Sequence, residues 1–497
     1  MDGLSHLGAA LAALAGPWQI AYALGATLSG IVIGLLPGLS ATLGVALFTT
    51  LTLKMAPADA ILVLICVYVG AIYGGSRTAI LLNIPGTAAN AAACLDGNML
   101  ARQGQAGRAM GIATTGSVAG SLFGVVCLAM FTPLLAETAL MFGAFEFFWL
   151  GMVGVMMSGS LTGSNPIKGW LMGLLGIFVA TIGLDPIHAH PRFTFDSNAI
   201  SGGIGLIPAL VGAFGFAEIL TVMSQSKLKT MISSVDSVLP KIADLLRYWR
   251  TIIRSGLIGV FIGILPGVGE DMAAWSSYAA AKRASKEREK FGKGSIDGLI
   301  AAETGDNAAI PGALIPALAL GIPGSAPAAV LMAAMIIHGA QPGPMLMVNQ
   351  PQFVYDVVGI TLVATLAILV FGLVLVRPIL WVLKVPREII MPIVFVLCVL
   401  GSYSITQRLF DVWVMLGVGI ACFWLRRRGF PVAPFVLGLV LGDIVDKSLR
   451  RGLVLSDGSL LPFFTRPISA ALAALVGVML LMQLPMVQRW FTPRSRT

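Results

Sequence analysis

The chain has 497 residues, of which 57% are hydrophobic and only 11% are charged, and its formal net charge is +9. Water-soluble proteins carry roughly 25% charged residues, so this composition excludes a soluble globular protein and predicts an all-α polytopic membrane protein. The positive charge lies in loops and in the C-terminal tail, where it reports orientation in a membrane and not affinity for nucleic acid. The five cysteines are scattered and predict neither a disulfide framework nor a metal site.

Apolar stretches follow one another along the chain, and we expect roughly 10 to 14 membrane crossings together with hairpins that enter and leave on one side. A helix needs about 20 apolar residues to span a bilayer, and shorter stretches such as 324–338 predict half-helices. The predicted segments are residues 19–36, 40–53, 60–82, 109–134, 141–160, 166–184, 200–222, 252–265, 298–320, 324–338, 355–383, 389–401, 410–425, 430–446 and 468–486.

An aliphatic-Pro-Gly turn interrupts these apolar segments at four places. Proline removes a helix hydrogen bond and glycine frees the backbone, so each turn should end one helix and start another. At membrane depth, bare helix ends are tolerated only inside protein or beside a polar cavity, and in transporters such breaks hold substrate and ions. The turns are GLLPGLS at 34–40, NIPGTA at 83–88, GILPGVG at 263–269 and GIPGSA at 321–326.

The four turns form two pairs, which predicts an internal duplication. GLLPG at position 34 matches GILPG at position 263, an offset of 229, and IPGT at position 84 matches IPGS at position 322, an offset of 238. The extra residues of the second half coincide with the charged loop KRASKEREKFGKG. We therefore expect two membrane repeats, residues 1–235 and 236–497.

The basic residues predict how the repeats are oriented. Residues 255–281 lie between the basic stretches 224–254 and 282–293, and the positive-inside rule assigns both stretches to the cytoplasm. The segment between them should thus be a re-entrant hairpin with its tip at Leu265-Pro266-Gly267. The matching segment 19–53 has almost no flanking charge, as an inverted repeat requires. Basic residues on both sides of 430–446 oppose this scheme, so either that segment is another hairpin or the rule fails there.

Donors beside the turns are candidates for binding a carboxylate. The half-helix after Pro85-Gly86 exposes free N–H groups and the positive end of its dipole, and the buried fork of Arg77 could pair two carboxylate oxygens. The alternatives are that Ser, Thr and Asn here merely cap helices and that Arg77 forms a structural ion pair or reaches an interface. The predicted substrate-binding residues are Ser40, Ser76, Arg77, Asn83, Pro85, Gly86, Thr87, Asn90, Pro323, Gly324 and Ser325.

A second set of residues is rich in oxygen and predicts a site for a coupling ion. Na⁺ would be bound by carbonyls, hydroxyls and a carboxylate of the broken helices, whereas a proton would need one buried carboxyl group. The sequence leaves Na⁺ and H⁺ open, and Glu270 could instead stabilise the start of a helix. The predicted coupling-ion residues are Pro37, Gly38, Pro266, Gly267, Glu270, Glu303, Thr304, Asp306 and Asn307. We predict no cofactor and no metal site. We expect Asp185, His188 and His190 to lie in a loop that binds no metal.

The motifs resemble the large membrane subunit of the tripartite tricarboxylate transporters (TctA-type permeases). The stretches that carry the resemblance are GLLPGLSATLGVALFTTLTLKM, YGGSRTAILLNIPGTAANAAACLDGNMLARQGQAGRAMG, GILPGVGEDMAAWSSYAAAKR, AAETGDNAAIPGALIPALALGIPGSAPAAVLMAAMIIHGAQPGPM and LPFFTRPIS, within residues 19–470. After Glu303-Thr304 the family pattern reads Ala-Asn-Asn where this chain has Gly305-Asp306-Asn307, and Arg77 stands where a small or apolar residue is expected. These departures lie near the expected site, so the substrate or the coupling ion could differ from the family's citrate-like prototype.

The resemblance implies a multi-pass protein of the bacterial inner membrane that imports a small organic carboxylate. It implies two partners, a small membrane subunit and a periplasmic solute-binding protein, and uptake driven by an ion gradient, since the sequence contains no G-x-x-x-x-G-K-[ST] phosphate loop. An organic-anion channel or facilitator without ion coupling is the alternative. An intramembrane enzyme is disfavoured, because none of the four histidines stands in a recognisable motif with Ser or Cys.

Overall fold

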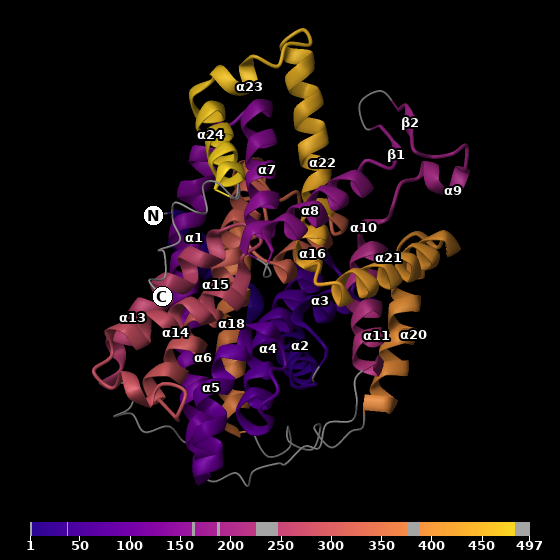
Figure 1. Cartoon of the computed structure of the whole chain (residues 1–497). Helices are drawn as coiled ribbons and strands as arrows, with labels where there is room; N and C mark the ends of the chain where they lie inside the picture. The colour runs from indigo at the N-terminus through magenta and orange to yellow at the C-terminus, as the bar shows by residue number, and fades with distance from the viewer. Residues whose placement is uncertain are drawn as a thin grey trace, which may run out of the picture. The chain divides into compact units, whose positions relative to one another are not determined.

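The computed structural model describes residues 2–36, 38–161, 165–185, 189–224, 247–374 and 387–482. These residues form helices and one two-stranded antiparallel ribbon, β1 (Gly183–Leu184) and β2 (Pro191–Arg192), which confirms the predicted all-helical membrane protein (Figure 1). Eight of the described helices are long and apolar enough to cross a bilayer: Pro17–Leu35, Pro57–Leu82, Ala88–Ala139, Ala144–Leu161, Leu206–Ser224, Pro351–Val374, Glu388–Thr406 and Leu409–Arg427. The larger crossing number expected from the sequence stays a prediction.

Contacts divide the chain into two compact units, and the division does not follow sequence order. The first unit comprises Met1–Glu137 and Gly205–Trp424, and the second comprises Thr138–Ile204 and Leu425–Thr497. The proposed site lies wholly in the first unit.

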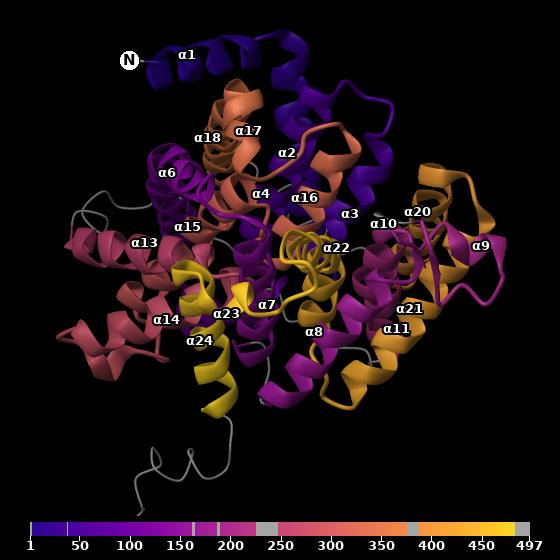
Figure 2. The same ribbon diagram turned by 90° about the horizontal axis from the view of Figure 1, so that it is seen from above.

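The first half of the chain supplies the following elements to the first unit: α1 (Asp2–Leu14), α2 (Pro17–Leu35), α3 (Ala41–Leu51), α4 (Pro57–Leu82), η1 (Ala88–Asn90), α5 (Ala91–Leu100), the π-helix η2 (Ala101–Gln105), nearly all of α6 (Ala106–Ala139), α10 (Leu206–Leu210), the π-helix η3 (Val211–Phe216) and α11 (Ala217–Ser224). The later part supplies α13 (Trp249–Ile264), α14 (Gly269–Ala284), η4 (Arg288–Lys290), α15 (Ile296–Leu320), α16 (Ala326–Ile337), α17 (Pro344–Asn349), α18 (Pro351–Val374), α20 (Arg387–Thr406) and most of α21 (Leu409–Arg427). Figure 2 shows α1 lying crosswise beside α17 and α18.

Two helical hairpins occupy the positions that the Pro-Gly turns predicted. Helices α2 and α3 flank the first turn, and α13 and α14 flank the second. Ser277 donates a hydrogen bond to the carbonyl of Ser255 at 3.4 Å, so α13 and α14 run antiparallel. Each hairpin packs on one long helix, α2 on α4 and α13 on α15.

The other two Pro-Gly turns break the chain after the long helices. Helix α4 ends at Asn83 and α15 at Gly321, both in the left-handed region with φ of 57° and 71°. The chain then folds back: Gly86 N donates to the Gly75 carbonyl, and Gly324 N donates to the Ala313 carbonyl, each at 3.3 Å. The short helices α5 and α16 follow. The predicted breaks are thus confirmed.

The same close approaches recur in the two halves. A Cβ on Gly86 would overlap the carbonyl oxygen of Gly34, and a Cβ on Gly324 would overlap that of Gly263. The recurring contact has the offsets found in the sequence, 34 to 263 and 86 to 324. The duplication itself stays a prediction.

The long helices α4 and α15 run in opposite directions. Ser76 of α4 contacts Glu303 of α15, and one turn further along α4 Ile80 shares a cluster with Leu299. Higher residue numbers along α4 therefore lie beside lower residue numbers along α15. An inverted repeat would require this antiparallel arrangement.

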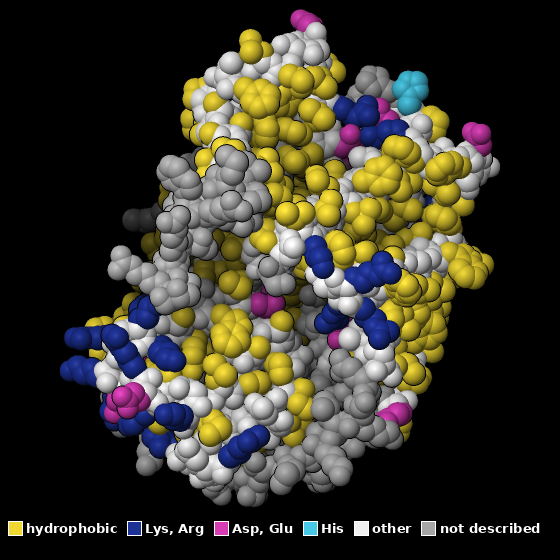
Figure 3. Space-filling view, in the orientation of Figure 1, with side chains coloured by type: hydrophobic (Ala, Val, Ile, Leu, Met, Phe, Trp, Pro, Cys, Tyr) yellow, Lys and Arg dark blue, Asp and Glu magenta, His cyan; other side chains and the backbone are white. Residues whose placement is uncertain are grey.

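A buried aspartate fastens the charged loop between α14 and α15. Asp96 of α5 accepts hydrogen bonds from the backbone N–H groups of Gly292 (2.8 Å), Gly294 (2.9 Å) and Ser295 (2.7 Å), and from the hydroxyl of Tyr278 (2.9 Å). The carboxylate thereby joins α5 to the end of the unit where Lys and Arg gather, over α13 and α14 (Figure 3).

The second unit contains α7 (Ala144–Leu161), α8 (Pro166–Ala180), the ribbon, α9 (Asn198–Ser201), α22 (Val432–Leu455), α23 (Pro462–Thr465) and α24 (Pro467–Leu481). Helix α22 is continuous past residue 446, so the basic residues that follow the predicted segment 430–446, namely Lys447, Arg450 and Arg451, belong to the same helix. Arg450 pairs with Asp185 at 2.7 Å and with Asp446 at 3.1 Å, and Lys447 pairs with Asp443 at 2.7 Å. His188 lies outside the described residues.

We predict that Gly324→Ala lowers the free energy of unfolding by about 1–3 kcal/mol or more, because the added methyl group collides with the rigid backbone of α13. Thermal unfolding of the purified protein measures the change. Gly25→Ala in α2 is the matched control, since a Cβ there meets nothing within 4 Å; equal stability of the two variants would contradict the packing described.

Candidate functional site

Polar side chains gather in the interior of the first unit, where α4, α6 and α15 meet the starts of α5, α14 and α16. All are at most 7% exposed. We call this set the buried polar cluster: Tyr68, Ser76, Thr87, Asn90, Ser117, Glu270, Glu303, Asp306, Asn307 and Ser325.

Helical spacing explains how the chain assembles this cluster. Tyr68 and Ser76 are eight residues apart on α4, and Glu303 and Asn307 are four apart on α15. Residues at these intervals lie on one face of a helix. The antiparallel contact of α4 with α15 then brings the two polar faces together.

Glu303 is held by hydroxyl groups from two helices. Its Oε2 accepts hydrogen bonds from Ser76 at 2.7 Å and from Ser117 of α6 at 2.9 Å, whereas Oε1 is buried and has no partner among the described residues. One half of this carboxyl group therefore remains available to a proton or a cation.

Asp306 is held by two amides. Asn90 Nδ2 donates to one carboxyl oxygen at 3.2 Å, and Asn307 Nδ2 donates to the other at 2.6 Å. Thr87 in turn donates to Asn90 Oδ1 at 2.6 Å, while the buried Asn307 Oδ1 finds no partner in the described part of the chain. The first broken helix is thus linked to a carboxyl group contributed by the other half of the chain.

The second broken helix makes the corresponding link in the other direction. Ser325 caps α16 by accepting from Ala328 N at 3.3 Å, and its Oγ lies 2.9 Å from the hydroxyl oxygen of Tyr68 on α4. Tyr68 also donates to Glu270 at the start of α14. Both predicted turns therefore reach the cluster through their first polar residues.

The cluster is acidic. It contains three buried carboxyl groups, Glu270, Glu303 and Asp306, and within the described ranges no Lys or Arg forms an ion pair with any of them. Burying a charge without a partner is costly. The arrangement therefore suits bound cations or protons, and an anion could approach only once these acids are neutralised.

Arg77 lies beside the cluster but is engaged elsewhere. It is 3% exposed and donates to the Met110 carbonyl at 2.8 Å and to Thr114 Oγ1 at 2.7 Å, both on α6. Its guanidinium stands 4.4 Å from the centre of the Tyr73 ring. These contacts tie α4 to α6, and the contact of Arg77 with substrate stays a prediction.

The other predicted residues are placed in several ways. Ser40 caps α3, accepting from Leu43 N at 3.1 Å, and Thr304 donates to the Gly116 carbonyl at 3.2 Å. Among the described residues, no hydrogen bond joins either side chain to the cluster. At the hairpin tips, Gly38 (φ 96°) and Gly267 (φ 71°) adopt positive φ angles and Pro266 is half-buried. In the other two turns, Asn83 and Pro85 are exposed, whereas Gly86, Pro323 and Gly324 are buried. Pro37 lies outside the described residues.

Sequence reasoning missed Tyr68 and Ser117. A signal for Tyr68 existed, since it stands on the same helix face as Ser76 in an otherwise apolar segment. Ser117 gave no local signal, because its contact with Glu303 joins residues 186 positions apart and depends on how α6 packs.

Comparison with known proteins gives one family and two relatives. The model of the tripartite tricarboxylate transporter TctA family matches residues 20–437. The chain is 35% identical over 477 residues, 95% of each protein, to an "uncharacterized 52.8 kDa protein in TAR-I ttuC' 3'region" of Agrobacterium vitis. It is also 35% identical over 219 residues, 44% of this chain and 90% of the relative, to an "uncharacterized protein in TAR-II ttuC' 3'region" of the same organism. No solved structure matches.

We predict that Arg77→Lys destabilises the protein by about 1.5–3 kcal/mol, because an ammonium cannot reproduce the forked donation to two groups on α6. Thermal unfolding tests this. Arg283→Lys, at an exposed position of α14, is the control. If Arg77→Lys were as stable as the control, the network around Arg77 would not be structural.

Proposed function

We propose that this chain, which belongs to the tripartite tricarboxylate transporter TctA family, is the large membrane subunit of a secondary transporter that imports small organic carboxylates across the bacterial inner membrane. The observation that carries the proposal is the buried polar cluster, where two broken helices meet three carboxyl groups that lack a basic partner among the described residues. Broken helices at membrane depth are where secondary transporters bind substrate and ions.

The coupling ion is assigned to the α15 side of the cluster. Glu303 Oε1 and Asn307 Oδ1 are buried oxygens without a partner in the described chain, and their spacing places both on one face of the helix. Leaving such groups unsatisfied costs about 1–3 kcal/mol each. Na⁺ bound by these oxygens, or a proton on the carboxyl group, would remove that cost.

The substrate is assigned to the turns at Thr87 and Ser325. The N-termini of the helices that follow supply N–H donors and the positive end of a dipole, which favour a carboxylate. Both residues are buried, at 7% and 1% exposure, so a solute reaches them only when the surrounding helices move apart. That requirement fits a carrier that opens alternately to the two sides.

The charges at the proposed ion site affect binding at the proposed substrate site. An anionic solute is repelled by the acids of the cluster in a medium of low dielectric constant, and a bound cation or proton removes that repulsion. Each ligand then strengthens the binding of the other by the same factor, and this mutual dependence is how an ion gradient would drive uptake.

The partners are proposed from the family. A tripartite system requires a small membrane subunit and a periplasmic solute-binding protein beside this chain. The chain has no phosphate loop that would supply energy from ATP, so the gradient is the proposed energy source.

Transport by proteoliposomes tests the proposal. The chain is reconstituted with its small subunit and binding protein, an Na⁺ or proton gradient is imposed, and uptake of labelled di-, tri- and aromatic carboxylates is measured. A carrier accumulates the solute above its outside concentration. Uptake that stops at equal concentrations under every gradient would support a channel or facilitator instead.

We predict that Glu303→Gln weakens coupling while the fold is retained, since the amide oxygen of Gln can still accept from Ser76 and Ser117. With Na⁺ as coupling ion, the half-saturating Na⁺ concentration should rise at least about tenfold, equivalent to about 1.4 kcal/mol. With H⁺, exchange should persist and accumulation should vanish, because Gln resembles the permanently protonated acid. The exposed Glu289→Gln is the control; unaltered coupling in Glu303→Gln would remove this residue from the ion site.

We also predict that Thr87→Phe and Ser325→Phe abolish uptake while membrane insertion is retained, because a large ring fills the space beside the turn. Ser325→Ala, which removes only the hydroxyl group that faces Tyr68, should leave the protein folded and lower the uptake rate. Ser404→Phe at an exposed site of α20 serves as control. Wild-type uptake by the Thr87 and Ser325 variants would exclude both residues from the pathway.

A further inference from the structure

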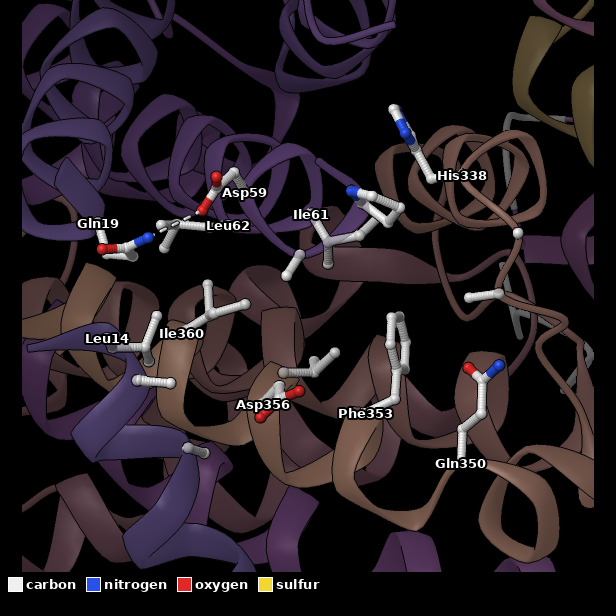
Figure 4. A pocket seen from close by; sticks show the side chains of 17 residues that line it. Leu14, Gln19, Asp59, Ile61, Leu62, His338, Gln350, Phe353, Asp356 and Ile360 are labelled. Atoms are coloured by element: carbon white, nitrogen blue, oxygen red, sulfur yellow. Dashed lines mark hydrogen bonds between the residues drawn. The ribbon is translucent and has the colours of Figure 1, made fainter. Parts of the chain in front are cut away.

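A cavity of about 410 Å³ opens in the first unit away from the buried polar cluster, with which it shares no lining residue. It lies among α1, α2, the first turns of α4, the end of α16 and the start of α18 (Figure 4). The cavity adjoins the start of α4, whereas Ile80 lies near the end of that helix. The cavity is therefore remote from Asp96 and from the basic loop that Asp96 binds. The volume is in the range of small-molecule sites, roughly 300–1,000 Å³.

Two aspartates face each other across this cavity. Figure 4 shows Asp59 on the α4 side and Asp356 on the α18 side. Asp59 accepts one hydrogen bond from Gln19 at 3.4 Å, and Asp356 accepts one from Gln352 at 2.9 Å. Both donors are neutral amides, which leave the negative charge of the two carboxylates uncompensated.

No basic residue compensates these charges. None of the 17 lining residues is Lys or Arg, and within the described ranges neither aspartate forms an ion pair. Nearby unit charges of equal sign repel any further negative group. The cavity therefore rejects the carboxylates that the transport site is proposed to carry and favours a positive group.

The remaining walls are apolar and suit a hydrocarbon chain. Ile61 and Leu62 line one side, and Leu14, Phe353 and Ile360 line the other. His338, at the end of α16, contributes a ring nitrogen, Nε2, which is buried and has no partner in the described chain. Few polar groups set among apolar walls are typical of sites that orient an organic ligand.

We propose that this cavity binds a small organic cation, with its ammonium group between Asp59 and Asp356 and its hydrocarbon part against the apolar walls. The proposal is independent of the transport activity proposed above, because it uses other residues and a ligand of opposite charge.

Binding of three probes with the same hydrocarbon chain tests the proposal: n-pentylammonium, pentan-1-ol and pentanoate. The full chain is placed in nanodiscs of zwitterionic lipid, empty nanodiscs correct for partition into lipid, and binding is measured by calorimetry. We expect n-pentylammonium to bind at least tenfold more tightly than the alcohol, and pentanoate not to bind. Equal binding of the amine and the alcohol, or tighter binding of pentanoate, would overturn the proposal.

Substitutions locate the site. Asp59→Asn and Asp356→Asn should each weaken n-pentylammonium binding at least tenfold, and Ile360→Trp should abolish it by filling the cavity while both carboxylates remain. Asp443→Asn, at an exposed position of α22, is the matched control and should bind as the wild type does. Retention of binding by the two Asn variants, each confirmed as folded by its unfolding temperature, would refute the assignment. Uptake of carboxylates is measured in parallel, so that a failure of this site and a failure of the transport site are distinguished.

Discussion

The interior of the first unit depends on how carboxyl groups are held without basic partners. Glu303 and Asp306 lie on one helix, are at most 1% exposed, and receive hydrogen bonds from serine hydroxyls and asparagine amides. Neutral donors lower the cost of burial but do not cancel a charge. The unit is therefore suited to take up positive charge, and ion coupling is proposed on this basis.

The packing of backbones decides where those donors stand. Gly34 lies against Gly86, and Gly263 lies against Gly324, so tightly that no side chain fits between them. These contacts bring each broken helix back to mid-length of its long helix, and the residues that follow the turns, Thr87 and Ser325, then reach the cluster. Substrate donors and ion ligands are neighbours because the same glycine contacts place both.

Two acidic regions in one unit have different environments. The buried polar cluster is closed, rich in hydroxyl and amide donors, and built from two broken helices that offer N–H groups to an anion. The cavity around Asp59 and Asp356 has mostly apolar walls, and none of its lining residues is Lys or Arg. The first is proposed to take a cation and an anion in one transport cycle, whereas the second is proposed to bind a cation alone.

The sequence by itself determined where helices break and which residues are too polar to face lipid. Proline and glycine act on their own backbone, so the turns at 83–88 and 263–269 could be located from local chemistry, and Glu303 and Asn307 were evident as oxygen donors in an apolar segment. Only the tertiary structure decided which donors meet which acceptors. Asn90 meets Asp306 across 216 residues, Asp96 captures the loop at 292–295, and Arg450 pairs with Asp185 across 265 residues. Such partners are chosen by the packing of whole helices, and no local pattern in the chain records that packing.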